Sequence, residues 1–220
     1  MNSLLEIDWQ GIGEATADTL TMLGLSTLFT VLIGLPLGVV LFLTSRGQPL
    51  EQFAVYALLS FVVNVLRSVP FIILMIMVIP LTKLLVGTSM GVPGSIPPLV
   101  IAAAPFFARL VETSLREVDR GVIRAAQAMG ATYWQIVWRV LLPESRPGLI
   151  AAVTITAVTL VSYTAMSGVI GGGGLGDLAI RYGYQRFQTT VMVVTVVILL
   201  VLVQILQSLG DRLVRHFQRK

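Results

Sequence analysis

Few side chains in this sequence could perform covalent chemistry. There is no cysteine, and the single histidine, His216, lies in a basic C-terminal segment. The glycine-rich stretch 171–176 fits the pattern GxGxxG, but it follows an apolar run instead of a strand. It also lacks the acidic residue expected about 20 positions later in a dinucleotide-binding fold. No GxxxxGK[ST] phosphate-binding loop occurs. The sequence therefore predicts no enzyme, no cofactor and no metal site.

Reversible binding is the remaining chemistry, and Arg67 is the clearest candidate for it. Arg67 is the only ionisable residue deep within a predicted membrane span, where a charge is by default a functional hypothesis. It could line a solute route, or it could hold backbone carbonyls freed near Pro70. Tyr163 and Met166 share one face of a later span and are weaker candidates for the route. Threonines on that face, such as Thr156, are expected to pack against other helices.

The elements that must position these residues are apolar helices. Hydrophobic residues make up 55% of the chain and charged residues 12%. A helix needs ~20 apolar residues to cross a hydrocarbon layer of about 30 Å. Five spans are expected, at about 19–44, 52–82, 99–111, 149–170 and 189–209. The predicted fold class is an all-α, polytopic membrane protein. The net charge of +4 is assigned to contact with lipid headgroups, and nucleic-acid binding is not expected.

The third span is the least regular of the five. Residues 86–98 are rich in turn formers, so a continuous helix is expected only from about 99 to 111, with a re-entrant segment as the alternative. Lys and Arg concentrate in cytoplasmic loops. Five crossings place the arginines between 109 and 146 on the same side as Arg46 and the basic tail. The opposite side then holds only Lys83, Arg181 and Arg186. This asymmetry favours five crossings, with the N-terminus outside and the C-terminus inside.

Glycine and proline positions predict how the first two spans are shaped. Gly34 and Gly38 lie one turn apart and permit close approach of another helix, and Pro36 is expected to bend the span. The second run is long for one crossing and too short for two. It is therefore predicted as one tilted or kinked helix with Pro70 near the bend.

An amphipathic segment lies between the third and fourth spans. An apolar stripe at spacings of three and four predicts a half-buried helix there. The stripe consists of Leu115, Val118, Val122, Ala125 and Met129. Gly130 suits the turn that follows this helix. Thr132 and Gln135 form a capping box for a second helix, which Pro143 is expected to stop. By itself such a pair commonly lies on a membrane surface.

The order of small residues in this segment resembles the EAA loop of ABC importer permeases. The matching residues are Ala125, Ala126, Gly130, Leu142 and Pro143. Segments 67–74, 103–109 and 171–184 also resemble the corresponding segments of these permeases. The resemblance is closest to the permease subunits of methionine importers. It implies a type I permease fold in which this loop docks into a groove on a separate ATPase. Small side chains suit a helix that seats closely in a groove. Arg124 replaces the acidic residue that opens the motif, so the salt bridge usually assigned to that position is not carried over.

The resemblance also implies partners and boundaries. The partners are a second copy of the chain, a cytoplasmic ABC ATPase dimer, an extracytoplasmic substrate-binding protein and the lipid membrane. The glycine-rich stretch is expected to be a mobile external loop that meets the binding protein. Its candidate contacts are Gly173, Gly174, Arg181 and Tyr182. Residues 1–18 are expected to form an external segment, 19–210 the permease domain with a coupling loop at about 112–147, and 211–220 a basic cytoplasmic tail.

The function implied by the resemblance is ATP-driven amino-acid import, with methionine as the solute, across the bacterial inner membrane. The alternatives are an ion-coupled secondary carrier, a permease for another small amino acid or amine, and a membrane scaffold without transport. No predicted span holds a carboxylate away from its ends, which counts against an ion-coupled carrier. A scaffold would have no evident need for the alanine–glycine docking unit.

Overall fold

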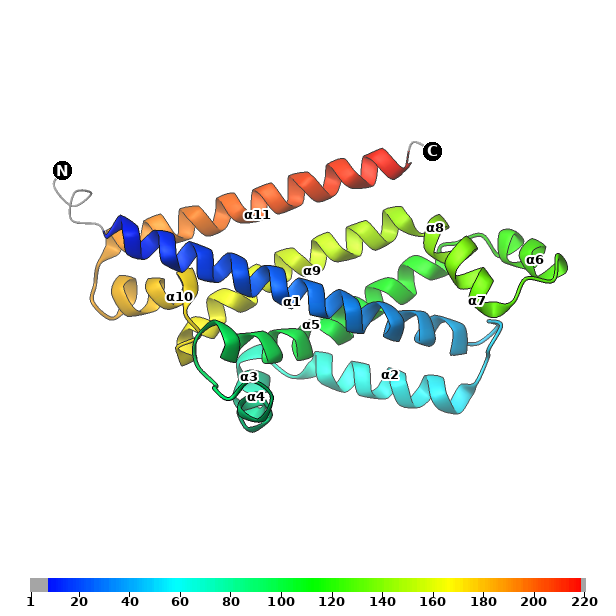
Figure 1. Ribbon diagram of the computed structural model, residues 1–220, viewed down its shortest axis with the longest axis horizontal. Helices are drawn as coiled ribbons and strands as arrows, with labels where there is room; N and C mark the ends of the chain where they lie inside the picture. Colours follow the sequence, from blue (N-terminus) through cyan, green and yellow to red (C-terminus); the bar gives the residue numbers. More distant parts are fainter. Residues whose placement is uncertain (1–7, 219–220) are drawn as a thin grey trace. The chain divides into compact units, whose positions relative to one another are not determined.

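The computed structural model describes residues 8–218, and every regular element within that range is helical (Figure 1). The predicted all-α fold class is confirmed. The long helices are α1 (Trp9–Thr44), α2 (Phe53–Ser68), α5 (Gly91–Arg116), α9 (Arg146–Ser167) and α11 (Thr189–Gln218). The shorter ones are α3 (Phe71–Met77), α4 (Ile79–Val86), α6 (Arg120–Ala128), α7 (Tyr133–Ile136), α8 (Leu142–Glu144) and α10 (Gly174–Leu178). Short π or 3-10 segments complete the order: η1 (Val137–Leu141), η2 (Gly168–Ile170) and η3 (Ala179–Tyr184).

Four helical segments of the described chain are long and apolar enough to cross a membrane: α1, α5, α9 continued by η2, and α11. A fifth span exists if α2 and α3 are counted as one bent pair, so the expected five spans are compatible with the structure. The break in that pair falls at Val69 and Pro70, where the bend was predicted. Proline has no N–H to donate and disfavours helical geometry in the residue before it.

The start of α5 differs from the prediction. The helix begins at Gly91 and runs unbroken to Arg116. The prediction that turns extend to residue 98 is therefore wrong for residues 91–98. Proline is tolerated in a first helical turn because the N–H groups there have no partner within the helix, and Pro93 lies in that turn. The Ser95 hydroxyl donates to the carbonyl of Gly91 at 3.1 Å, which adds a bond across the same turn. Gly91 and Pro93 therefore lie in the first turn of this helix instead of preventing it, and the helix continues through Pro97 and Pro98.

The chain forms two compact units, which are described separately. The first unit contains the described residues up to Phe29, then Val69–Ala102 and Ala157–Gln207. The second contains Thr30–Ser68, Ala103–Thr156 and the described residues from Ser208 onward. The long helices α1, α5, α9 and α11 each contribute residues to both.

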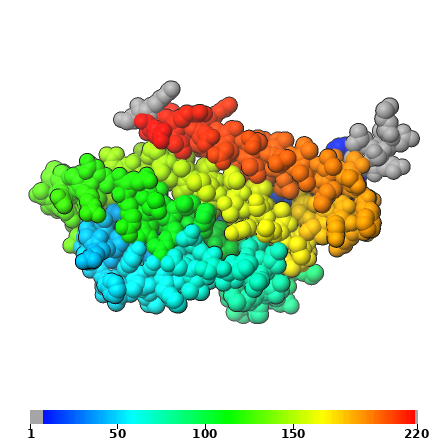
Figure 2. Space-filling view, turned by 180° about the vertical axis from the view of Figure 1, so that it is seen from behind, coloured from blue at the N-terminus to red at the C-terminus, as the bar shows by residue number. Residues whose placement is uncertain are grey.

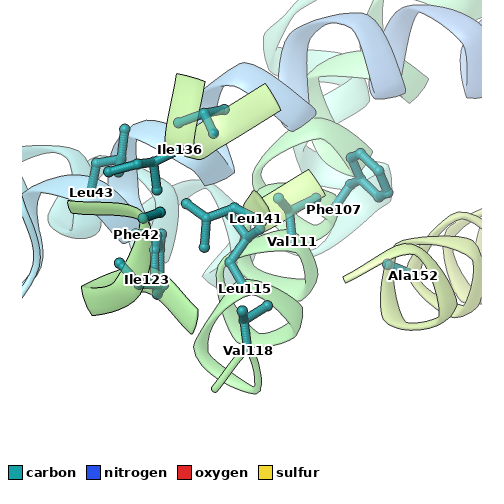
Figure 3. Packing of buried hydrophobic residues seen from close by; sticks show 12 residues of the cluster. Phe42, Leu43, Phe107, Val111, Leu115, Val118, Ile123, Ile136, Leu141 and Ala152 are labelled. Carbon is teal, nitrogen blue, oxygen red and sulfur yellow. The ribbon is translucent and has the colours of Figure 1, made fainter. Parts of the chain in front are cut away.

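The second unit is held by an apolar cluster between α1, α5 and the segment that joins α5 to α9. Figure 3 shows Phe42 from α1, Val111 and Leu115 from α5, and Ile123 and Ile136 from the joining segment, packed in one cluster. Elsewhere in this unit α1 and α5 approach closely. A Cβ atom at Gly34 would lie 2.9 Å from the carbonyl oxygen of Ala104, and one at Gly38 would lie 2.6 Å from that of Ala108. The predicted helix contact at these two glycines is confirmed.

Helix α11 is apolar and exposed along most of its length. Figure 2 shows it as a continuous orange-to-red band on one face. Of its most apolar 18-residue window only 6% is buried within this chain. Exposed apolar surface of this extent is what a lipid-facing helix or an interface between membrane proteins presents.

Candidate coupling loop and solute-pathway residues

The segment between α5 and α9 is built from two capped helices, as the sequence predicts. Asp119 starts α6, because its carboxylate accepts a hydrogen bond from the N–H of Gly121 at 2.7 Å. Gly130 ends α6 with a positive φ of 78°. The N–H of Gly130 bonds the carbonyl of Gln127 at 2.9 Å, and the N–H of Ala131 bonds that of Ala126 at 3.1 Å. This pair of bonds is the Schellman arrangement, in which glycine avoids the strain of a left-handed backbone.

The second helix starts with the predicted capping box. The Thr132 hydroxyl accepts from the N–H of Gln135 at 3.3 Å, and the Gln135 side chain accepts from the N–H of Thr132 at 2.9 Å. The expectation that Pro143 stops this helix is wrong. The chain passes from α7 into the π-helical segment η1 and then into α8, in whose first turn Pro143 lies. The π-helical segment, in which the N–H of Leu142 bonds the carbonyl of Val137, directly precedes the proline.

The predicted apolar stripe is also wrong in register. Leu115 belongs to the end of α5 and Val118 to the turn after it, so the expected single helix is two helices joined at 117–119. Within α6 the buried residues are Ile123 and Ala126, and not the predicted Val122, Ala125 and Met129. The break at Asp119 restarts the helical phase, so a stripe counted from Leu115 falls on the exposed face of α6.

The structure divides the five predicted coupling residues between an inner and an outer face. Ala126 is 5% exposed and packs in the cluster of the second unit. Ala125 and Gly130 are exposed, and Leu142 and Pro143 are half-buried. Only Ala125 and Gly130 are thus fully presented for contact with a partner, whereas Ala126 supports the loop from inside.

Large apolar side chains of the same segment are also exposed. Met129 is 82% exposed and Trp134 69%, and Trp138 stands against Trp134 in an edge-to-face contact with ring centroids 5.5 Å apart. Exposed apolar groups gathered on one short segment are typical of an interaction surface. Arg124 is exposed near the same segment and lines a hollow of about 190 Å³ with the turn at Gly47.

The candidate pathway residues lie in different units. In the second unit Arg67 is exposed, next to the last residue of α2, with its guanidinium carbon 5.8 Å from the ring centroid of Phe106. It therefore lies at the break of the bent α2–α3 pair, next to the end of one helix. In the first unit Tyr163 stacks on Phe71 with parallel rings 4.3 Å apart, and Met166 is exposed. Thr156 is buried and bonds the carbonyl of Ala152, which agrees with a packing role.

A buried ionic cluster in the second unit was missed from the sequence. Glu112 of α5, whose side chain is 4% exposed, accepts from Arg109 at 2.6 Å and from Arg116 at 2.7 Å. The hydroxyl of Tyr56 in α2 donates to it at 3.2 Å. Glu112 lies four residues before the end of α5, which is compatible with the expectation that carboxylates lie only near span ends, but its burial was not predicted. The spacing of three and four between Arg109, Glu112 and Arg116 was the available signal.

The predicted binding-protein contacts lie together in the first unit, but not on a loose loop. The glycine-rich segment is packed: Leu175 is fully buried, and its N–H donates to the hydroxyl of Thr19 in α1 at 2.9 Å. The prediction of a mobile loop is therefore corrected, since positive φ angles at three glycines allow a tight buried turn. Gly173, Gly174, Arg181 and Tyr182 line a hollow of about 430 Å³. Arg181 is ion-paired with Asp177, a further lining residue.

Comparison with known proteins gives relatives over nearly the whole chain. The chain is 53% identical over 206 residues to the probable D-methionine transport system permease protein MetI of Vibrio cholerae, covering 94% of this chain and 92% of that protein. It is 46% identical over 205 residues to the methionine import system permease protein MetP of Bacillus subtilis, covering 93% and 92%.

Solved structures give the same result. A structure of inward facing conformations of the MetNI methionine ABC transporter aligns with a TM-score of 0.93 and 47% identity, covering 94% of this chain and 96% of that one. An amino acid ABC transporter with histidines aligns with a TM-score of 0.77 at 18% identity, covering 98% and 99%, and shows the fold alone.

The family described as binding-protein-dependent transport system inner membrane component matches residues 34–220. With that match, and with the apolar helices already described, the chain belongs to this family of multi-pass inner-membrane proteins.

Proposed function

We propose that this chain is the permease subunit of an ATP-driven methionine importer. Two copies enclose the solute route, a cytoplasmic ABC ATPase dimer supplies the energy, and a substrate-binding protein delivers methionine from outside. The observation that carries the proposal is the near-complete alignment with relatives named for methionine transport. The ATPase activity resides on the partner, and this chain is not an enzyme.

The loop between α5 and α9 is the proposed contact with the ATPase. Its exposed face combines small residues, Ala125 and Gly130, with Met129 and Trp134. Small residues let the backbone approach a groove, and apolar groups gain free energy when the groove removes them from water. The caps at both ends of α6 hold this face in one geometry before the partner arrives, which lowers the entropic cost of docking.

The proposed orientation puts this loop in the cytoplasm, with the N-terminus outside and the C-terminus inside. The support is the basic charge of the loop and of the end of α11, which includes Arg212 and Arg215. The glycine-rich turn with Arg181 and Tyr182 then faces the substrate-binding protein. A cysteine introduced at Met129 in this cysteine-free chain should react with an impermeant maleimide only when the cytoplasmic side is open. Labelling from outside intact cells would contradict this topology.

The decisive experiment is reconstitution of the permease, its ATPase and the binding protein in liposomes. Uptake of D- and L-methionine should require ATP on the ATPase side and stop when the ATPase is omitted. Concentrative uptake by this chain alone under an ion gradient would mean a secondary carrier. Transport of a different amino acid, with methionine rejected, would retain the importer and change its solute. Absence of any flux with all components present would favour the scaffold.

Arg67 is the proposed pathway residue with the clearest test. In Arg67→Ala, preserved recovery of the ATPase in equal amount with altered uptake supports a role in the route. If the ATPase is no longer recovered with the variant, Arg67 is instead needed for the structure of α2. Phe106→Ala is the matched control, because it removes the ring beside the guanidinium and keeps the charge.

A further inference from the structure

The Glu112 cluster joins α2 to the helix that leads into the coupling loop. Arg116, the last residue of α5, donates to Glu112 Oε1 at 2.7 Å, and Tyr56 of α2 donates to the same oxygen at 3.2 Å. Arg109 donates to Oε2 at 2.6 Å. One buried carboxylate therefore receives donors from two helices. Arg109 and Arg116 donate from α5, the helix that leads into the loop, and Tyr56 donates from α2.

Arg109 extends the link further along α2. Its second terminal nitrogen donates to the hydroxyl and, at 3.3 Å, to the carbonyl of Ser60, and to the side-chain oxygen of Asn64 at 3.1 Å. Tyr56, Ser60 and Asn64 are spaced four residues apart, so they form one polar face on α2. The cluster is thus a line of directional bonds that follows two turns of α2.

The loop side of this link is rigid. Leu115 at the end of α5 is fully buried, and it packs in one cluster with Ile123 of α6 and Ile136 of α7 (Figure 3). A displacement of α6 must therefore carry the end of α5 with it, because a close-packed cluster transmits displacement instead of absorbing it.

Apolar contacts also join α2 and α5. They centre on Val63 of α2, Ala108 of α5 and Leu41 of α1. Apolar contacts have no preferred direction, whereas the hydrogen bonds of a buried carboxylate favour one register of the two helices. Arg109 and Glu112 therefore add directional bonds that favour a single register of α2 on α5.

We infer that Glu112 is a positioning residue that transmits movement of the coupling loop to α2. The inference rests on the proposed function, because it assigns to this cluster the step between ATP-driven loop movement and rearrangement of the solute route. Without the carboxylate charge, α5 still follows the loop but α2 no longer follows α5. Hydrolysis of ATP then continues with less solute moved.

The test is the number of methionine molecules taken up per ATP hydrolysed by the complete complex in liposomes. Glu112→Gln keeps the size of the side chain and removes its charge. Tyr56→Phe removes only the bond from α2 and is the milder second variant. Glu51→Gln is the matched control, an exposed carboxylate that lies just before α2 and outside the coupling loop. We expect uptake per ATP to fall roughly tenfold in Glu112→Gln, within the range of about 5- to 150-fold typical of coupled sites. Uptake per ATP should fall less in Tyr56→Phe, and in the control it should equal the wild-type value.

Each outcome decides between the two proposals. An unchanged ratio in an assembled Glu112→Gln complex overturns the inference and leaves the importer intact. Loss of ATPase recovery in both Glu112→Gln and Tyr56→Phe also overturns it, since the cluster would then serve assembly alone. Absence of ATP-dependent methionine uptake in the wild type overturns the proposed function itself.

Discussion

The two adjacent alanines of the coupling loop should respond differently to the same substitution. Ala126 is 5% exposed and packed in the cluster of the second unit, whereas Ala125 is exposed. Leucine at either position keeps a good helix former, so intrinsic helix propensity changes little. The difference between Ala126→Leu and Ala125→Leu therefore separates packing within the loop from contact with the ATPase.

At Ala126 the three added carbons must enter a closed space. Overpacking of this kind costs about 1–3 kcal/mol. A chain of this size loses about 2–4 °C of melting temperature per kcal/mol, so Ala126→Leu should melt roughly 2–12 °C below the wild type. At Ala125 the same carbons project into water, so the free energy of unfolding should change by no more than about 0.5 kcal/mol, as is usual for surface substitutions. The melting temperature should therefore shift by no more than about 2 °C.

The assay pairs thermal unfolding of the purified permease with recovery of the ATPase. Ala125→Leu should retain the wild-type melting temperature and recover less ATPase, because its side chain obstructs the docking face. Ala126→Leu should lower both quantities. Full ATPase recovery with Ala125→Leu would refute the assignment of this face to docking. An unchanged melting temperature with Ala126→Leu would refute the account of the loop interior.

Three further substitutions test the turns and the helix contact. Gly130→Ala should cost about 1–2 kcal/mol because its φ of 78° is left-handed, and a pull-down should show weaker ATPase binding, with Gly130→Asn less affected. Thr132→Ala removes a cap worth about 0.5–2 kcal/mol and should speed amide hydrogen exchange at the start of α7. Gly38→Ala puts a Cβ 2.6 Å from the Ala108 carbonyl oxygen and should lower the yield of folded permease. Gly13→Ala, with nothing within 4 Å, should not.

Local chemistry made some elements predictable from sequence. A glycine after α6 and a threonine with glutamine three positions on determine their turns by bonds within a few residues, so Gly130 and the Thr132–Gln135 capping box were found correctly. Gly34 and Gly38 were likewise recognisable, because their spacing alone puts both on one helix face.

The errors arose where the effect of a residue depends on its neighbours in space. The prolines before residue 99 suggested turns, yet Pro93 lies in the first turn of α5, where a missing N–H costs least, and the helix continues through Pro97 and Pro98. The stripe through Val122 failed because Asp119 ends one helical phase and begins another. The burial of Glu112 was overlooked because one of its hydrogen-bond donors, Tyr56, lies 56 positions away in the sequence and is brought beside it only by the fold.

The coupling loop has to meet two opposing requirements, and the structure assigns them to different residues. Transmission of movement needs a stiff body, which the buried Ile123, Ala126 and Ile136 provide together with the end of α5. Docking needs a surface that a groove can approach, which Ala125 and Gly130 provide on the outer side. If one face served both purposes, each change that improved docking would disturb packing. Because Ala125 is exposed while its neighbour Ala126 is buried, the docking surface can change without altering the link to α5, and this separation is what makes the adjacent-alanine experiment informative.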